Sequence, residues 1–395
     1  MGTVRGTVTA VGGFYLSALA GRYGRHENGG IMPNQTSADL SIEAICERAL
    51  DGTPPGAPEL KALLSLPSVE AAEPLFATAR ELRRRTFGDI VFTSGFVYFS
   101  TYCRNHCNFC LYRKGNDAAP RYRKTLEEVV AVARGLASEG VNLIDLTMGE
   151  DPLTHESGDY TPVYEMIEAV REETGKPIMI SPGVVPADVI EKMKEAGATI
   201  YACYQETHSK DFFHKRRVGQ DYDERAAARD AARRAGLLVE DGMLTGIGDT
   251  IDDRVNSILN MSDHDWDLAR IMTFVPEEGT PLANLPVQSP LHEILVTATL
   301  RLMRPTWMTT ASLDCESLAG TAARVNAGAS VVTSIIYPET GLAGVALAEH
   351  DIEEGRRTVP AVLGVLAELG LRQGTDEEYA AWIERSPAAH VVPVA

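Results

Sequence analysis

With 395 residues, the chain is long enough for one large domain or two ordinary ones, and no apolar run in it approaches the roughly 18 residues of a membrane-spanning helix. Its 37 Lys and Arg against 55 Asp and Glu give a formal net charge of -18, which argues against a nucleic-acid partner and against an anionic membrane surface. Six cysteines, three of them clustered, favour the reducing cytoplasm over a disulfide framework.

The first 35 residues are predicted to lie outside the fold. The apolar residues 8–20 follow Arg5, as in a weak secretory signal, but two glycines interrupt the run. We therefore expect Met32 to be the translation start and residues 1–35 to be disordered or absent.

Residues 36–89 are predicted to form an N-terminal helical segment. The spacing of apolar residues and the positions of glycine, proline and N-cap residues indicate helices over 40–50 and 58–66. They also indicate a third helix that begins at Ser68 and ends near 88.

From Ile90 onward, strand-like and helical segments alternate. The predicted strands are 90–99, 141–147, 177–181, 199–205, 237–245, 270–275, 308–312 and 330–335. Each is followed by a helical pattern, such as the one that the capping box Thr125–Glu128 opens. The order and the size predict an α/β protein with one (βα)8 TIM barrel over 90–350 and flanking helices over 351–395. An open doubly wound sheet is the alternative.

Directly after the first predicted strand, Cys103, Cys107 and Cys110 follow the spacing Cys-x3-Cys-x2-Cys. A loop this short can bind three corners of an iron–sulfur cube and leave the fourth iron open to a small molecule. Structural zinc would need a fourth ligand, and the nearest candidate is His106, inside the loop. The pattern favours the cluster over zinc.

Other polar residues also lie after or near the C-terminal ends of predicted strands: Glu150, Ser181, Glu206, Arg270 and Asp314. In a barrel these positions converge with the cysteines on one mouth, where the active sites of such folds lie.

The cysteine loop resembles the radical S-adenosylmethionine superfamily, with Phe109 at the usual aromatic position before the last cysteine. Further segments, in collinear order between about Leu60 and Gly370, resemble the methylornithine synthase family of pyrrolysine biosynthesis. They are 98–103, 144–152, 179–183, 204–207, 217–220, 239–242, 270–274, 311–314 and 326–329. Biotin synthase and the maturase of [FeFe]-hydrogenase share the barrel and the cluster and are the relatives to exclude.

This resemblance implies a [4Fe-4S] cluster on the three cysteines, with S-adenosylmethionine chelated to its open iron. One electron, from a donor such as flavodoxin or ferredoxin, then yields a 5'-deoxyadenosyl radical. The implied reaction isomerises L-lysine to 3-methylornithine by hydrogen abstraction, cleavage of the Cα–Cβ bond and recombination at another carbon. A reaction in a closed lumen needs no second subunit, so we expect a monomer.

The resemblance also implies site residues. Phe109, Glu150, Ser181, Glu206 and Arg225 would hold S-adenosylmethionine, the last two at its methionine end. A diamino acid needs carboxylates and an arginine fork, and Asp145, Arg270, Ser312 and Asp314 would supply them.

Several of these residues also have ordinary structural interpretations. Asp145 and Asp314 could cap helices or pair with barrel arginines, and Arg225 shares a helix face with Arg229 and Arg233 that would normally be solvated. Cys203 is expected to pack in the core, whereas Cys315 could either pack or donate a hydrogen atom. The competing functions are a radical enzyme acting on another small molecule and a noncatalytic electron carrier.

Overall fold

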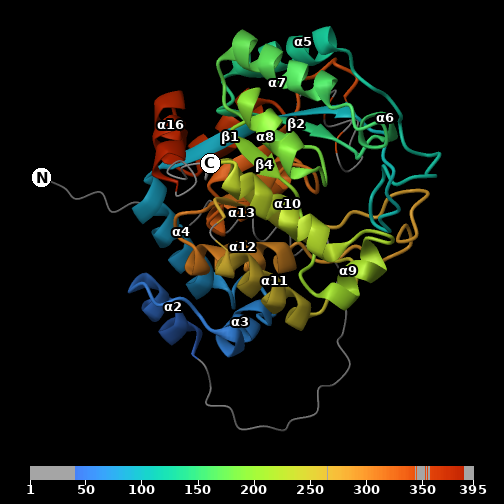
Figure 1. Cartoon of the computed structure of the whole chain (residues 1–395). Helices are drawn as coiled ribbons and strands as arrows, with labels where there is room; N and C mark the ends of the chain where they lie inside the picture. Colours follow the sequence, from blue (N-terminus) through green and yellow to red (C-terminus); the bar gives the residue numbers. More distant parts are fainter. Residues whose placement is uncertain are drawn as a thin grey trace, which may run out of the picture.

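A closed barrel of eight parallel strands lies at the centre of the molecule (Figure 1). The structure is a computed structural model that describes residues 41–386 except 265, 343, 345–351, 353 and 355. The N-terminal extension over 1–35 therefore lies outside the described residues. Within the described residues, no helix is long and apolar enough to cross a membrane.

Each strand of the barrel pairs in parallel with the next, and the last pairs with the first. The strands are β1 (Ile90–Ser100), β2 (Leu143–Met148), β3 (Ile178–Ser181), β4 (Ile200–Ala202), β5 (Leu238–Thr245), β6 (Leu268–Thr273), β7 (Met308–Ser312) and β8 (Val331–Ile335). The predicted (βα)8 barrel is confirmed, and the open sheet is excluded. A two-residue strand that was not predicted, β9 (Arg372–Gln373), pairs with the start of β1.

Helices connect and surround the strands. They are α5 (Leu126–Glu139), α6 (Pro152–His155), α7 (Thr161–Thr174), α8 (Ala187–Glu195), α9 (Lys210–Arg216), α10 (Tyr222–Arg234), α11 (Ile251–Asp263), α12 (Leu291–Met303), α13 (Leu318–Asn326), α15 (Val359–Glu368) and α16 (Asp376–Arg385). The predicted capping box is present, because Thr125 Oγ1 accepts from the Glu128 amide and the Glu128 carboxylate accepts from the Thr125 amide.

Three helices precede the barrel: α2 (Ile42–Leu50), α3 (Ala57–Leu64) and α4 (Glu73–Phe87). α4 packs against α12 and α13, and α2 and α3 cover α4, α11 and α12 on one flank, as Figure 1 shows. The apolar faces predicted for these helices are buried against this flank, with Leu60 and Leu63 inaccessible to solvent.

An apolar layer fills the N-terminal end of the barrel. Every strand contributes to it, through Phe92, Leu143, Met179, Ile200, Leu238, Leu268, Met308 and Val331. Tyr379 and Trp382 of α16 pack against the layer from outside and close this end. Buried charged side chains such as Glu150, Glu206 and Asp314 lie at the opposite, C-terminal end, where the predicted site lies.

Some predicted boundaries were wrong for local reasons. The third N-terminal helix begins after Ala72, because Ser68 caps a separate turn through the Ala71 amide. β4 ends at Ala202, well before Gln205, and its continuation turns through Glu206, whose φ is +68°.

Two further element boundaries differ from the predicted ones. β6 occupies Leu268–Thr273 in place of 270–275. Within the flanking segment predicted over 351–395, α15 begins at Val359, and the turn before it contains Arg357.

Candidate active site

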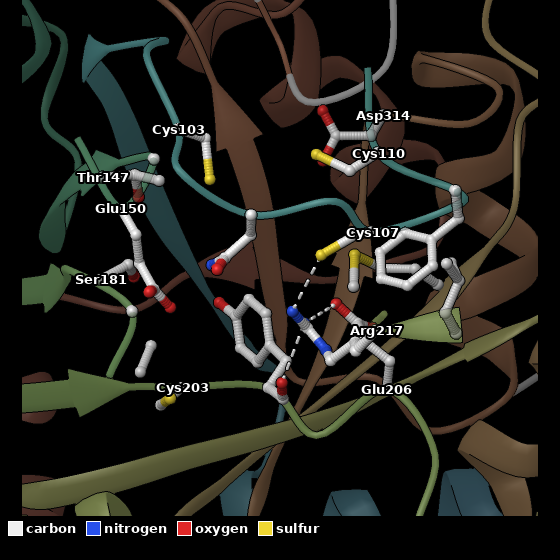
Figure 2. A pocket seen from close by; sticks show the side chains of 18 of the residues that line it. Cys103, Cys107, Cys110, Thr147, Glu150, Ser181, Cys203, Glu206, Arg217 and Asp314 are labelled. Carbon is white, nitrogen blue, oxygen red and sulfur yellow. Dashed lines mark hydrogen bonds and ion pairs between the residues drawn. The ribbon is translucent and has the colours of Figure 1, made fainter. Parts of the chain in front are cut away.

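The cavity at the C-terminal ends of the strands is lined by residues from many parts of the barrel (Figure 2). They include the three clustered cysteines after β1, Thr147 and Glu150 of the β2 region, Ser181 at the end of β3, Cys203, Tyr204 and Glu206 after β4, Arg217 and Arg225, and Asp314 and Cys315 after β7. Of the residues predicted to converge on one mouth, the cysteines, Glu150, Ser181, Glu206 and Asp314 line this cavity, whereas Arg270 does not.

The cysteine loop is held by its backbone. Arg104 N donates to Glu150 O at 2.8 Å, Asn108 N donates to Arg216 O at 2.8 Å, and Lys114 N donates to Asn105 O at 2.7 Å. His106 is exposed, as expected for a residue that is not a ligand. Burial raises the pKa of the Cys103 thiol to about 11. The loop thus presents three largely dehydrated thiols on one wall of the cavity.

Gly149 explains how close the β2 loop comes to the cysteines. A Cβ at this position would lie 2.2 Å from the carbonyl oxygen of Tyr102 and 3.0 Å from Cys103 Cβ. Only glycine permits this approach. The next residue, Glu150, is thereby placed on the cavity wall.

Glu150 is a buried carboxylate surrounded by donors. It pairs with Arg104 at 3.1 Å and with Arg225 Nη1 at 3.5 Å, and it accepts from the Val184 amide at 3.1 Å. Burial alone would raise the pKa of Glu150, but the charge of Arg225 and the amide hydrogen bond lower it below its ordinary value. Glu150 is therefore ionised at neutral pH.

Glu206 pairs with Arg217 and not directly with Arg225, with which it was predicted to act. Its Oε1 lies 3.0 Å from Arg217 Nη2, whereas Oε2 is buried without a hydrogen-bond partner. Burial raises the pKa of Glu206. A positive φ on a residue other than glycine is strained, and such strain is often found at functional sites.

A second network joins Asp145 of β2 to Arg270 of β6. Arg270 Nη2 lies 3.9 Å from Asp145 Oδ2, and Arg270 Nε lies 3.6 Å from Glu240 Oε2. Asp145 Oδ1 accepts from Thr147 and Ser181, which both line the cavity. Burial raises the pKa of both carboxyl groups, and the positive charge of Arg270, which faces both, lowers it only in part.

Asp314 lines the cavity and is already paired. Arg357 Nη1 lies 2.8 Å from its Oδ1, and Ser334 and Ser312 donate to its Oδ2 at 2.6 and 2.9 Å. Asp314 therefore pairs with an arginine, as the structural alternative predicted, and it also lines the cavity, as the site prediction required. Ser312 does not itself line the cavity but donates to Asp314, which does.

Three comparisons with known proteins agree on the family. Residues 97–260 match the family model described as the radical SAM superfamily. A curated 3-methylornithine synthase from Methanosarcina barkeri is 41% identical over 340 residues, which cover 86% of this chain and 96% of that protein. The chain belongs to the 3-methylornithine synthase family.

The structures agree with this assignment. A crystal structure of methylornithine synthase matches with a TM-score of 0.81 and 41% identity, over 86% of this chain and 99% of that one. The [FeFe] hydrogenase maturase subunit HydE of Thermotoga maritima is 34% identical over 57% of this chain. The similarity to the synthases thus extends over much more of the chain.

Membership of the 3-methylornithine synthase family implies a [4Fe-4S] cluster and S-adenosylmethionine as cofactors. The donor set fits both. Three thiols line the same cavity. The orphaned Glu206 Oε2 is an acceptor for an ammonium group on the same cavity.

The arginine face of α10 is buried, so the ordinary expectation of a solvated face is wrong. Arg225 is 5% and Arg229 is 3% exposed. Arg225 Nε donates to Tyr204 O at 2.6 Å, and Arg229 pairs with Asp241 of β5 at 3.2 Å. These arginines fasten α10 to the cavity wall.

The two remaining thiols near the mouth line the cavity as well. Cys203 is buried, as expected, but it packs at the cavity wall. Cys315 Sγ donates to Thr273 O at 2.9 Å, and burial raises the pKa of this thiol to about 12. The Cys315 thiol is therefore neutral at neutral pH.

The sequence interpretation missed four residues of the site: Arg217, Gln220, Glu240 and Arg357. The first three lie in segments that carried the family resemblance, so that signal could have singled them out. Arg357 lies outside those segments, and its contact with Asp314 depends on the turn before α15.

Proposed function

We propose that this protein is a radical isomerase that converts L-lysine to 3-methylornithine. The observation that carries the proposal is the 41% identity to a curated synthase over 96% of that protein's length, together with a cavity lined by three cysteines, buried carboxylates and two arginines. When bound, the cluster would supply an electron, and S-adenosylmethionine would supply the radical that removes a hydrogen atom from an unactivated carbon.

The cofactor residues are proposed as follows. Cys103, Cys107 and Cys110 hold the cluster, and the backbone at Phe109 contacts the adenine. Glu150, Ser181, Glu206 and Arg225 bind the remaining parts of S-adenosylmethionine, and the free Glu206 Oε2 accepts from its amino group. In a buried site such charged hydrogen bonds fix orientation strongly.

The substrate is proposed to complete the charge balance around Arg270. Asp145 Oδ2 and Glu240 Oε1 are buried without hydrogen-bond partners, and the one guanidinium between them leaves a deficit of positive charge. An ammonium group of a diamino acid removes this deficit, because buried charges must be paired. Arg270 can in turn hold the substrate carboxylate with its fork of donors.

Asp314 and Ser312 are proposed to receive the second ammonium group at the mouth. The pairing with Arg357 fixes the Asp314 carboxylate in place, and Ser312 fixes its rotamer. A substrate held at both ends keeps the scissile bond in one position, which accelerates the reaction through orientation.

We further propose that an acidic one-electron carrier such as flavodoxin or ferredoxin reduces the cluster. His106, Lys114 and Lys215 are exposed around the cysteine loop, although the whole chain has a net charge of -18. A locally basic surface attracts an acidic carrier. The protein is proposed to act in the cytoplasm. It is also proposed to act as a monomer, because the residues proposed to hold the cofactors and the substrate all lie on one chain.

The test is anaerobic incubation of the reconstituted protein with dithionite, S-adenosylmethionine and L-lysine. We expect 3-methylornithine, identified against an authentic standard, and none from the Cys107→Ala variant. No product, despite an intact cluster and cleavage of S-adenosylmethionine, would contradict the proposal. A panel of D-lysine, ornithine and other amino acids shows in that case which substrate the protein uses.

A further inference from the structure

The surroundings of Cys107 differ from those of the other two cysteines of the loop. Gln220 Nε2 lies 2.9 Å from Cys107 Sγ, and Arg217 Nη1 lies 3.6 Å from the same sulfur. For Cys103 and Cys110, no side chain of the described residues donates to the sulfur. Figure 2 shows Arg217 reaching from the side of Glu206 toward Cys107.

The amide of Gln220 has one permitted orientation. Its Oε1 faces Arg217 Nη1 and Arg225 Nη1, both at 3.4 Å. A guanidinium has donors and no acceptor, so the oxygen of the amide must face the two arginines. The NH2 group is thereby directed at Cys107 Sγ, which can only accept once the thiol is deprotonated.

Both arginines are themselves fixed. Arg217 donates to Tyr204 O at 3.1 Å and pairs with Glu206, and Arg225 donates to the same carbonyl at 2.6 Å and pairs with Glu150. The turn after α9 passes through Gly219, whose φ of +77° brings the chain back toward the cavity. The pose of Gln220 is therefore set before any cofactor binds.

We propose that Gln220 is a positioning residue that donates a hydrogen bond to the Cys107 thiolate of the bound cluster and raises the reduction potential of that cluster. A hydrogen bond to a ligand sulfur stabilises the reduced, more negative cluster more than the oxidised one. The inference rests on the [4Fe-4S] cluster of the proposed function and is independent of lysine as substrate.

The first experiment is a redox titration of the reconstituted holoenzyme, monitored by the EPR signal of the reduced cluster, without S-adenosylmethionine or lysine. Gln220→Met keeps the length of the side chain and removes the donor. We expect the ratio of reduced to oxidised cluster at a fixed potential to fall about tenfold, which corresponds to 59 mV for one electron. An unchanged potential at full iron content overturns the proposal.

Gln373→Met is the matched control. Gln373 also donates its amide to buried groups, Thr93 Oγ1 at 2.6 Å and Gly140 O at 2.7 Å, but it lies on β9 beside the start of β1. Gln373 Nε2 also lies 3.5 Å from Asn142 Oδ1, so each variant loses three side-chain hydrogen bonds. Gln373→Met is expected to keep the wild-type potential. An equal shift in both variants would mean a general loss of structure and would also overturn the proposal.

A second readout needs no substitution. Holoenzyme grown with glutamine labelled with 15N in the side-chain amide is examined by pulsed EPR for coupling between the reduced cluster and nitrogen. We expect a 15N coupling in the wild-type protein. Its absence there overturns the proposal even where Gln220→Met fails to hold a cluster. Failure of the lysine assay with a normal 15N coupling would instead contradict the proposed substrate alone.

Discussion

At the scale of single residues, the site is defined by charges that the protein alone does not balance. Asp145 and Glu240 share Arg270, and each keeps one buried oxygen without a hydrogen bond. Asp314, by contrast, has its own arginine and two serine donors. The two aspartates looked alike in the sequence, yet their surroundings differ: Asp145 shares one distant guanidinium with Glu240, whereas Asp314 has a close guanidinium of its own.

Asp145→Asn tests this difference. The substitution removes the charge that we assign to one ammonium of the substrate, and an unpaired buried charge costs about 3–5 kcal/mol. We expect the KM for lysine to rise by about a hundredfold or more, with iron content and the EPR signal unchanged. The exposed Asp252→Asn on α11 is the control and should behave as wild type. A wild-type KM in Asp145→Asn would remove this residue from the site.

At the scale of elements, local patterns were sufficient for the barrel but not for its contacts. Alternation of apolar strands with amphipathic helices identified all eight units, because each unit carries its own periodicity. β4 was predicted too long, since the turn at Glu206 is stabilised by Arg217, which no local pattern reveals. Contacts such as Arg357 with Asp314 join distant parts of the chain, and one sequence does not show which of many arginines is near.

The contact between α10 and β5 gives a prediction for acid stability. Burial would raise the pKa of Asp241, but Arg229 and His208 lower it below its ordinary value of 3.8. A carboxyl group with a lower pKa in the folded state than in the unfolded state stabilises the fold at pH values above its unfolded-state pKa. This stabilisation is lost as the pH falls through the folded-state pKa.

Asp241→Asn should therefore lower the free energy of unfolding by about 3–5 kcal/mol at pH 7, because it leaves Arg229 buried without its partner. Urea titrations from pH 8 downward should show a constant difference in the free energy of unfolding between the variant and wild type to about pH 5. This difference should become smaller below pH 3.8. A difference that widens on acidification would contradict the sign of this shift.

At the scale of the whole molecule, the two ends of the barrel differ in the side chains that they contain. The apolar layer and α16 close one end, and the buried charged groups that line the cavity lie at the other. The molecule is acidic overall, and the exposed basic residues beside the cysteine loop stand out against that charge. Asn108 Nδ2 donates to Lys215 O at 2.9 Å, which holds the two basic segments together.

Reversal of this local charge should slow reduction by an acidic carrier. For Lys114→Glu with Lys215→Glu, we expect the rate of cluster reduction by flavodoxin to fall at least about tenfold at low salt, with less difference at high salt. Reduction by dithionite corrects for changes in the cluster itself. Lys192→Glu, on an exposed position of α8, is the control. Equal effects of both changes would place the docking surface elsewhere.

The central claim is that the chain rearranges the carbon skeleton of lysine, and one labelled substrate tests it directly. L-lysine with 13C at both Cα and Cβ is incubated with the reduced holoenzyme and S-adenosylmethionine, and the product is examined by NMR. Cleavage of the Cα–Cβ bond and recombination at another carbon predict a product without one-bond coupling between the two labelled carbons. A product that retains this coupling, or lysine recovered unchanged while S-adenosylmethionine is consumed, would contradict the claim.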